Sequence, residues 1–279
     1  MKRWKLLLVI PLILILFGGY YFFTHSSLGI DKNNLPKFIQ QDFVDLSKIY
    51  SISKFRSGSG HDFSGGGETC RSMKHYFQPN DYANAPKDAN GIPPKPDGIN
   101  DISIYSPVDG TIASVSEEHT PIGKQVSIIP SKQSHFNIRL FHVYVDAAHK
   151  QGTKVKAGEK IGVIGQYQGT DISVQIGTFP WEENFVSYFD VMPDSLFAKY
   201  QERGIKSRDD LIITKAYRDA HPLKCGDGSK NDKASEMFVY PADYDHNQDE
   251  VHLSGYVKPT YQTQPQQNQN QNQSQQSNY

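Results

Sequence analysis

Histidine and aspartate side chains that could bind a metal ion or move a proton occur in three parts of the chain. His61 and Asp62 follow a glycine-rich run, His75 lies in an aromatic stretch, and His142 lies in a run of alternating apolar residues. A catalytic zinc ion takes three protein ligands and keeps a fourth position open for water. Residues of these types could therefore contribute to a metal site or move a proton.

Each candidate also has an ordinary structural explanation. Successive residues of a strand point to opposite faces, so His61 and Asp62 are not expected to enter one pocket. For His75 we prefer a hydrogen-bonded histidine on an aromatic strand. His142 fits a packed strand residue, and Asp62 fits a solvated carboxylate or the partner of an arginine.

Two stretches, 70–77 and 187–194, combine aromatic and charged side chains. Aromatic rings beside charges suit the binding of a glycan or peptide, and they suit core packing equally well. The predicted binding groove consists of His61, Arg71, His75, Tyr76, Tyr188 and Asp190.

The elements that must position these side chains are mostly short strands. Alternating apolar runs bounded by Gly and Pro turns are typical of an all-β sandwich or barrel. The predicted strands lie at 51–55, 101–105, 111–115, 125–129, 136–143 and 171–176, and residues 154–165 are expected to form a strand, a glycine turn and a second strand. Helices are expected at 35–46, 195–200 and 207–218, the last of them opened by a capping box.

Both ends of the chain differ in composition from its middle. Residues 1–5 are basic and 6–23 are apolar, close to the roughly 20 residues that cross a bilayer. The positive-inside rule then predicts a single-pass membrane protein with a cytoplasmic N-terminus and an extracytoplasmic domain. A cleaved signal peptide is the alternative, but it needs a small-residue cleavage site that the sequence lacks. Residues 259–279 form a Gln/Asn-rich tail that is expected to be disordered.

The cysteine count and the charge narrow the possibilities further. In an oxidising compartment, Cys70 and Cys225 are expected to form a disulfide, although two unrelated buried thiols are the alternative. The net charge is -1, and the sequence contains no basic patch that would indicate nucleic-acid binding. We expect a lead-in segment with a short helix at 26–54, a β domain at 55–179 and a helical extension at 180–258.

Four motifs of the β region resemble the M23 (LytM-type) peptidase family. They are Ser-Pro-Val-Asp-Gly-Thr-Ile at 106–112, Val-Ser-Ile-Ile at 126–129, Phe-His-Val at 141–143 and Val-Lys-Ala-Gly-Glu-Lys-Ile-Gly at 155–162. The resemblance implies a mainly β barrel or sandwich, the duplicated hybrid motif. The helical pattern after residue 180 predicts a helical layer appended at its C-terminal side. Lipoyl and biotinyl carrier domains share this skeleton, but the lysine flanked by Met that they need is absent.

The resemblance also assigns zinc chemistry to particular positions. The family binds zinc through a His-x-Gly-x-Asp stretch and through the second histidine of a late His-x-His. Residues 58–62 match the first stretch, with Gly58 in place of the histidine and Asp62 retained. The late pair falls on Asp171 and Ser173, so both histidines are missing.

One catalytic position of the family is kept. His142 corresponds to the strand histidine that polarises water, and Asp171 stands where its partner histidine would be. We therefore assign no catalytic residue and treat His142 and Asp171 as remnants. Zinc is not expected, although Asp62 with His75 or His142 remains a conceivable metal site.

These features predict a membrane-anchored, extracytoplasmic and catalytically inactive M23-like module. It would bind a cell-envelope glycopeptide or a partner protein, and contact the lipid bilayer through residues 6–23. One alternative is an active metal-dependent cell-wall endopeptidase with a rearranged site built from Asp62, His75, His142 and Asp171. Another is a purely structural envelope protein.

Overall fold

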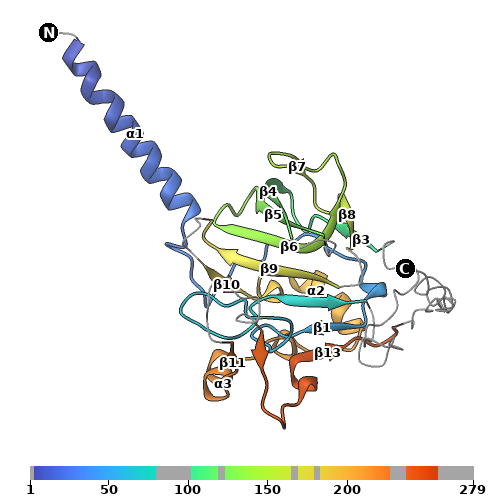
Figure 1. Ribbon diagram of the computed structural model, residues 1–279. Helices are drawn as coiled ribbons and strands as arrows, with labels where there is room; N and C mark the ends of the chain where they lie inside the picture. The colour runs from blue at the N-terminus through green and yellow to red at the C-terminus, as the bar shows by residue number, and fades with distance from the viewer. Residues whose placement is uncertain are drawn as a thin grey trace, which may run out of the picture.

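The computed structural model describes residues 3–79, 102–118, 123–164, 169–178, 183–226 and 237–256. The described chain is mainly antiparallel β structure with a few short helices and one long N-terminal helix (Figure 1). The predicted mainly β character is confirmed. The predicted tail at 259–279 lies outside the described residues.

One large sheet dominates the structure, and its path runs in the order β13-β1-β2-β9-β6-β5-β4-β7. β10 pairs with β9, and β8 pairs with both β3 and β6. A two-stranded sheet joins β11 (Lys224–Cys225) to β12 (Phe238–Val239). The strands of the large sheet are β1 (Ser51–Ser53), β2 (His75–Gln78), β3 (Ser103–Tyr105), β4 (Gly110–Glu117), β5 (Lys124–Pro130), β6 (Phe136–Val145), β7 (Lys154–Val155), β8 (Lys160–Ile164), β9 (Thr170–Ile176), β10 (Asn184–Val186) and β13 (Glu250–His252).

The centre of the sheet is covered on both faces, and β9 shows this most clearly. Every residue of β9 is buried. Ile172, Val174 and Ile176 belong to the main apolar core. Because side chains alternate along a strand, Asp171, Ser173 and Gln175 point to the opposite face. That second face is therefore polar and yet buried, which requires partners for its charges.

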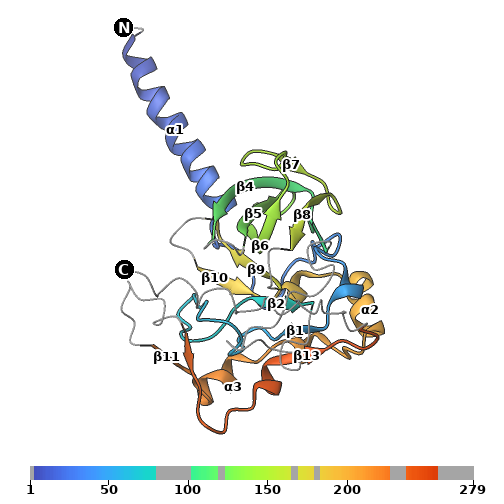
Figure 2. The same ribbon diagram turned by 45° about the vertical axis from the view of Figure 1, so that its right-hand side comes forward.

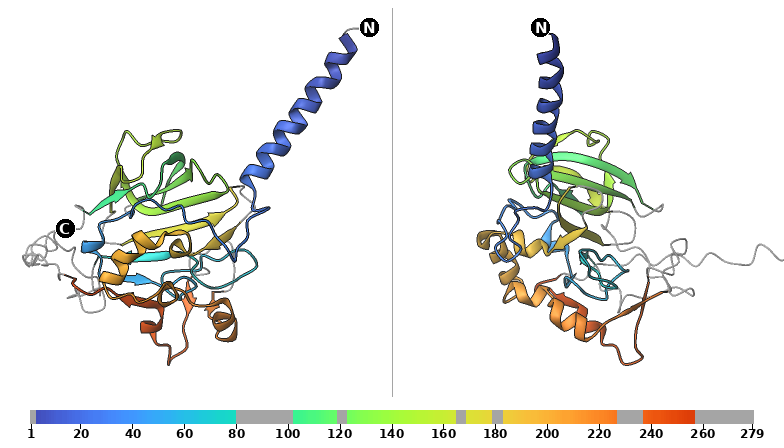
Figure 3. Two further views of the ribbon diagram at one scale, coloured as in Figure 1. Left: turned by 180° about the vertical axis from the view of Figure 1, so that it is seen from behind. Right: turned by 90° about the vertical axis from the view of Figure 1, so that its left-hand side faces the viewer.

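The helices after residue 183 lie beside the sheet (Figures 2 and 3). They are η3 (Tyr188–Val191), α2 (Asp194–Glu202), η4 (Arg208–Leu211), α3 (Lys215–Ala220) and η6 (His246–Asp249). The predicted capping box between Ser207 and Asp210 is present. The helix that it opens ends at Leu211, however, and α3 begins only at Lys215, so 207–218 is not one helix.

The segment after residue 180 does more than pack on the β domain. β10 pairs with β9, and β13 pairs with β1, so this segment adds strands to the same sheet. β1 itself lies in the lead-in that was expected to precede the domain. The boundaries placed at 54 and 179 therefore do not separate structural units.

The helix predicted at 35–46 does not form. Residues 35–43 belong to no helix or strand, and the short η1 (Leu46–Lys48) follows them. The amides of Phe38 and Ile39 donate to the carbonyl of Val191. Ile39 and Phe43 are buried in the main core. Tertiary contacts thus replace the intrahelical hydrogen bonds that the apolar spacing suggested.

The N-terminal helix α1 (Arg3–His25) projects from the β domain (Figure 1). Its last turn is tied to that domain, because the amide of Thr178 donates to the carbonyl of His25 at 2.8 Å. Within the part of the chain that the structure describes, no helix combines the length and the apolar character needed to cross a bilayer. The predicted single-pass membrane location, with residues 6–23 in the lipid, is therefore contradicted.

The predicted disulfide between Cys70 and Cys225 is present, with Cα atoms 5.5 Å apart. It joins the glycine-rich loop before β2 to the hairpin of β11 and β12. An isolated β-bridge between backbone groups also pairs His61 with Met237, next to β12. The C-terminal hairpin is thereby fastened to the loop that leads into the sheet.

Removing this disulfide should weaken the fold considerably. The cross-link closes a loop with a sequence separation of 155 residues. The chain-entropy model assigns a loop of that size up to about 5 kcal/mol. We expect Cys70→Ser/Cys225→Ser to lower the free energy of unfolding by several kcal/mol in urea titrations. Reduced wild-type protein should lose a similar amount of stability relative to the oxidised wild type. A loss below about 1 kcal/mol in both samples would contradict a stabilising role.

Candidate functional site

Three neighbouring strands bring Lys74, His142 and Asp171 together on the polar face of the sheet. Asp171 lies in β9, opposite Phe141 of β6 and Tyr76 of β2. Lys74 Nζ lies 2.8 Å from Asp171 Oδ2, and His142 Nε2 lies 3.3 Å from the same oxygen. The side chains of Lys74 and Asp171 are 2% and 1% exposed, so this is a buried ion pair.

The ammonium of Lys74 sits in a largely aromatic enclosure. Its Nζ lies 4.4 Å from the ring centre of Phe141, 4.8 Å from Tyr76 and 5.0 Å from Phe63. The imidazole Nε2 of His61 is 3.4 Å away. Aromatic faces attract a cation, and this attraction grows when water is excluded. The rings and the carboxylate together replace the water that the ammonium loses.

Glu118 at the end of the described part of the β4 segment completes the cluster. Its Oε2 lies 2.9 Å from His142 Nδ1 and accepts a second hydrogen bond, also 2.9 Å, from the backbone amide of His142. His142 has a positive φ of 60°, which few residues other than glycine adopt. Glu118, His142, Asp171 and Lys74 thus form a row of alternating charge.

The pKa values follow from this alternation. Burial alone would raise the pKa of Asp171, but Lys74 and then His142 outweigh it and hold that pKa at about 2. Burial would lower the pKa of His142, but Asp171 and Glu118 raise it to about 9. Burial also opposes the charge on Lys74, and Asp171 again prevails and raises its pKa. The ion pair is therefore fully charged at neutral pH.

His75 lies on the other face of the same strand, as the structural explanation predicted. One ring nitrogen, Nδ1, donates to the carbonyl of Ser53 at 2.8 Å, and Nε2 lies 2.9 Å from the hydroxyl of Ser187. Burial lowers the pKa of His75 to about 4, so the ring is neutral. Its place in the core separates it from Asp171 and from Asp62, and it is not available as a metal ligand.

The loop from 58 to 62 does not resemble a metal site either. Asp62 Oδ1 accepts a hydrogen bond from the amide of Arg71. A Cβ atom at Gly58 would lie 2.8 Å from the hydroxyl of Tyr244 and 3.0 Å from Asp249, so a larger side chain there would have to displace these groups. Among the described residues, no group of three or more His, Cys, Asp or Glu side chains is arranged to hold a metal ion.

The remaining groove candidates do not form one surface. Tyr188 is fully buried in the core, and Tyr76 faces Lys74 instead of a groove. Arg71 is buried and pairs with Glu68 at 2.8 Å and with Asp219 at 2.9 Å. Asp190 lines the cavity beside β10. The sequence analysis missed Lys74 and Glu118, although a lysine between aromatic residues was a usable signal.

That cavity has a volume of about 310 Å³ and lies beside β10. Its walls combine apolar side chains with both signs of charge. They include Phe55, Met73 and Phe185, the cations Lys32, Arg56 and Lys215, and the acids Glu68 and Asp190. Arg56 is held by Glu68 through two contacts of 2.7 and 2.8 Å. Asp190 is partly buried, and this burial raises the pKa of its carboxyl.

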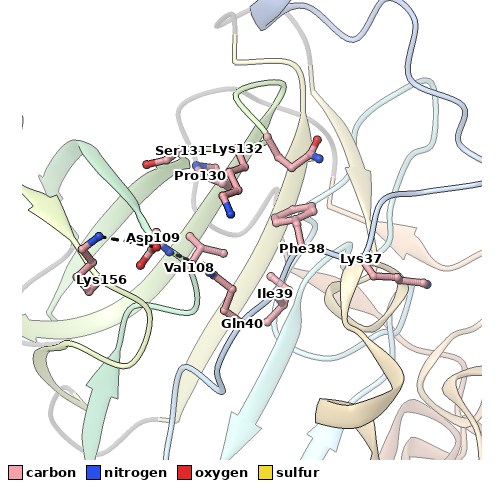
Figure 4. Close-up of a pocket in the computed structure, with 11 residues that line it drawn as sticks. Lys37, Phe38, Ile39, Gln40, Val108, Asp109, Pro130, Ser131, Lys132 and Lys156 are labelled. Atoms are coloured by element: carbon pink, nitrogen blue, oxygen red, sulfur yellow. Dashed lines mark hydrogen bonds and ion pairs between the residues drawn. The ribbon is translucent and has the colours of Figure 1, made fainter.

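A second cavity of about 390 Å³ lies beside the extended segment at 37–40 and the end of β5 (Figure 4). Phe38, Ile39 and Val108 form its apolar wall. Some of its polar groups bind one another: the amide of Asp109 donates to Gln40 at 2.6 Å, and Lys156 faces the Asp109 carboxylate at 3.8 Å. Neither cavity is lined by Lys74, His142 or Asp171.

Comparison with known proteins gives structural neighbours only. No protein-family profile matches the chain, and no curated protein matches it. Similar solved structures include the catalytic domain of the antimicrobial peptidase lysostaphin from Staphylococcus simulans, at 14% identity and a TM-score of 0.31 over 48% of this chain and 85% of that one. They also include Helicobacter pylori Csd3, at 16% identity and a TM-score of 0.36 over 60% of this chain and 40% of that one.

A third neighbour is the M23 metalloprotease pseudoalterin from the deep sea, at 11% identity and a TM-score of 0.30 over 82% of this chain and 99% of that one. Against lysostaphin in solution, the chain spans about half of that protein's length, 49%. These neighbours are M23 and LytM-type peptidases, the family that the β motifs resemble. The likeness is one of fold.

The raised pKa of His142 should make stability depend on pH. Its stabilising contribution is complete below the unfolded pKa of about 6.5 and is lost as the pH rises through about 9. We expect the free energy of unfolding to fall by about 3 kcal/mol over that interval. Denaturant titrations should show a much flatter profile for His142→Gln. The control is His252→Gln, which changes an exposed histidine. If the wild-type profile is as flat as the His142→Gln profile, this electrostatic role is refuted.

Proposed function

We propose that this chain is a non-catalytic M23-like module that acts by binding. The observation that carries the proposal is the buried ion pair between Lys74 and Asp171. By the motif resemblance, Asp171 stands where an active relative has a catalytic histidine. An ammonium ion bound to that residue places a fixed positive charge where a metalloenzyme needs its metal and its water.

The residues present do not fit zinc in the manner of the family. A catalytic zinc ion needs three nitrogen, sulfur or carboxylate ligands at about 2.0–2.3 Å. Gly58 has no side chain that could be a ligand, and Ser173 offers only a hydroxyl. Asp62 already accepts a hydrogen bond from the amide of Arg71. We therefore derive no hydrolytic step through a metal ion.

The cluster is also closed to a substrate. Lys74, Asp171 and Ser173 are each at most 2% exposed. Phe63 and Phe141 pack against each other above them, with ring centres 5.5 Å apart. A peptide bond would have to displace these rings to reach Asp171. This burial supports a structural role for the cluster and a ligand site elsewhere.

The cavity beside β10 is the ligand site that we favour. A mixed lining of apolar, cationic and anionic groups suits a short peptide that carries both signs of charge. The peptide part of a cell-envelope glycopeptide has this chemistry, and it is the ligand class we propose. If the cavity binds a partner protein and no glycopeptide, the proposed ligand class is wrong.

Metal content and hydrolysis test the non-catalytic part. Purified full-length protein, loaded with zinc and desalted, should retain far less than one zinc per chain by elemental mass spectrometry. It should release no fragments from cross-linked cell wall within the detection limit, whereas a zinc-loaded M23 peptidase assayed in parallel should. Near-stoichiometric zinc that is lost in Asp62→Ala, together with wall hydrolysis, would establish the metallohydrolase alternative.

Co-sedimentation with purified wall fragments tests the binding part. We expect Asp190→Asn and Lys32→Ala each to weaken binding by about tenfold, the effect of losing one interaction of about 1.4 kcal/mol. Lys132→Ala, in the other cavity, is the matched control and should bind as the wild type does. If wild-type protein does not sediment with the fragments, the glycopeptide proposal is rejected.

A further inference from the structure

We propose that the cavity beside β10 recognises a free amino group, and that the carboxylate of Asp190 binds it. The amino group belongs to a short peptide of the kind that the proposed function assigns to this cavity, so the inference rests on that function. It adds a criterion of selection. A peptide whose amine is charged binds, and the same peptide with that amine converted to an amide binds much more weakly.

The charged groups that line the cavity differ in whether they already have partners. Arg56 binds Glu68 through contacts of 2.7 and 2.8 Å. Lys215 binds Asp219, which lies four residues later on the same helix. Asp190 differs from both pairs, because its carboxylate forms no ion pair and accepts no hydrogen bond within the described part of the chain. It is therefore free to bind a cation from a ligand.

The backbone of Asp190, in contrast, is held in place. Asp190 belongs to η3, and its amide donates to the carbonyl of Ser187 at 3.0 Å. Lys37 Nζ donates to the carbonyl of Asp190. A fixed backbone presents the carboxylate to the cavity in a defined position, so little ordering of the protein opposes the binding of a ligand.

The surroundings of this carboxylate leave its charge incompletely balanced. Burial raises the pKa of Asp190, and the nearby cations Lys37, Arg56 and Arg208 only partly oppose this rise. Arg208 itself binds Asp194 at 2.8 Å, and Arg56 is held by its own acidic partner. A partly desolvated carboxylate attracts a cation more strongly than one in water does. A ligand's ammonium would therefore supply a partner that the described side chains do not.

The apolar wall of the cavity suits the carbon chain that carries an amine. Phe55, Met73 and Phe185 line the cavity and form a small apolar cluster of their own. Long cationic groups pack their methylenes against such surfaces and keep the charged end at a polar site. The ring of Phe55 already faces the guanidinium of Arg56 at 4.7 Å, so the carboxylate is the partner that remains for a new cation.

Lys32 supplies the opposite charge at an exposed position of the cavity. Its Nζ donates to the side-chain carbonyl of Asn184 at 3.0 Å, and that amide is neutral. Among the described residues, the ammonium of Lys32 has no acidic partner, so it remains able to bind a carboxylate. A peptide end that carries both an amine and a carboxylate would thus find one unpaired charge for each.

Acylation is the chemical change to which this arrangement is most sensitive. Peptides become cross-linked when an amine of one is joined to a carboxyl group of another, and the nitrogen of the resulting amide carries no charge. Asp190 would then be covered by the ligand without a cationic partner, which costs free energy. The cavity therefore distinguishes peptides with free amines from cross-linked ones, and directs the chain to wall regions in which cross-links are missing.

The experiment titrates full-length wild-type protein by calorimetry with one soluble wall fragment, which is untreated, N-acetylated or reductively N-dimethylated. Acetylation removes the positive charge, whereas dimethylation keeps the charge and adds bulk. We expect acetylation to weaken binding by about tenfold or more, the effect of losing one charge-assisted hydrogen bond. Dimethylation should change the affinity much less.

Asp190→Asn assigns this effect to one residue, because it should bind the untreated and the acetylated fragment with equal affinity. Asp109→Asn, in the other cavity, is the matched control and should discriminate between them as the wild type does. The comparison of fragments needs only wild-type protein, so it decides the question even if Asp190→Asn does not fold.

Two results would overturn the inference alone. Wild-type protein could bind the acetylated fragment as tightly as the untreated one, or acetylation and dimethylation could weaken binding equally. Discrimination that persists in folded Asp190→Asn would overturn the assignment to Asp190. Wild-type protein that binds no form of the fragment would instead reject the proposed function, so the two failures are distinguishable.

Discussion

The buried ion pair between Lys74 and Asp171 is the constraint on which the rest of this structure depends. Moving either charge out of water is costly, and losing one partner strands the other, which typically costs 3–5 kcal/mol. The pair therefore requires β2 and β9 to lie side by side in one register. His142 adds β6 to the same requirement, because it faces Asp171 at 3.3 Å.

A charged face inside the protein must also be covered, and the loop before β2 does this. Gly60 has a φ of 74°, and a Cβ atom there would lie 2.0 Å from the hydroxyl of Tyr76. Only glycine permits that close approach. The disulfide and the hydrogen bond from Tyr240 to the carbonyl of Gly58 hold the same loop down from the C-terminal side. The loop before β2 and the charged cluster that it covers therefore depend on each other.

Under the function that we propose, this chain separates two roles that a metallopeptidase combines. In such an enzyme one open groove holds both the metal and the substrate. In this chain the charged cluster is closed and stabilises three strands, while an open cavity of mixed charge lies beside β10. The proposed function follows this division, with ligand binding at the cavity and a structural role for the charged cluster.

The amino-acid sequence by itself determined most of the strands and predicted the disulfide between Cys70 and Cys225. Alternating apolar residues mark strands locally, and two cysteines in one chain can be paired without knowledge of the fold. The helix that the sequence predicted at 35–46 does not form, because amides of that segment donate to the carbonyls of Val191 and Pro107 instead of to each other. The apolar run at 6–23 was likewise taken for a membrane span, wrongly.

Only the tertiary structure decided which of the candidate side chains lie close together. Lys74 and His75 are neighbours in sequence, yet strand alternation sends one to Asp171 and the other into the core. Which of the two faces the charged cluster depends on the register between β2 and β9, whose residues lie almost a hundred positions apart. No local pattern encodes that pairing, because the partners of a buried charge are chosen by packing across the sheet and not by their neighbours in the chain.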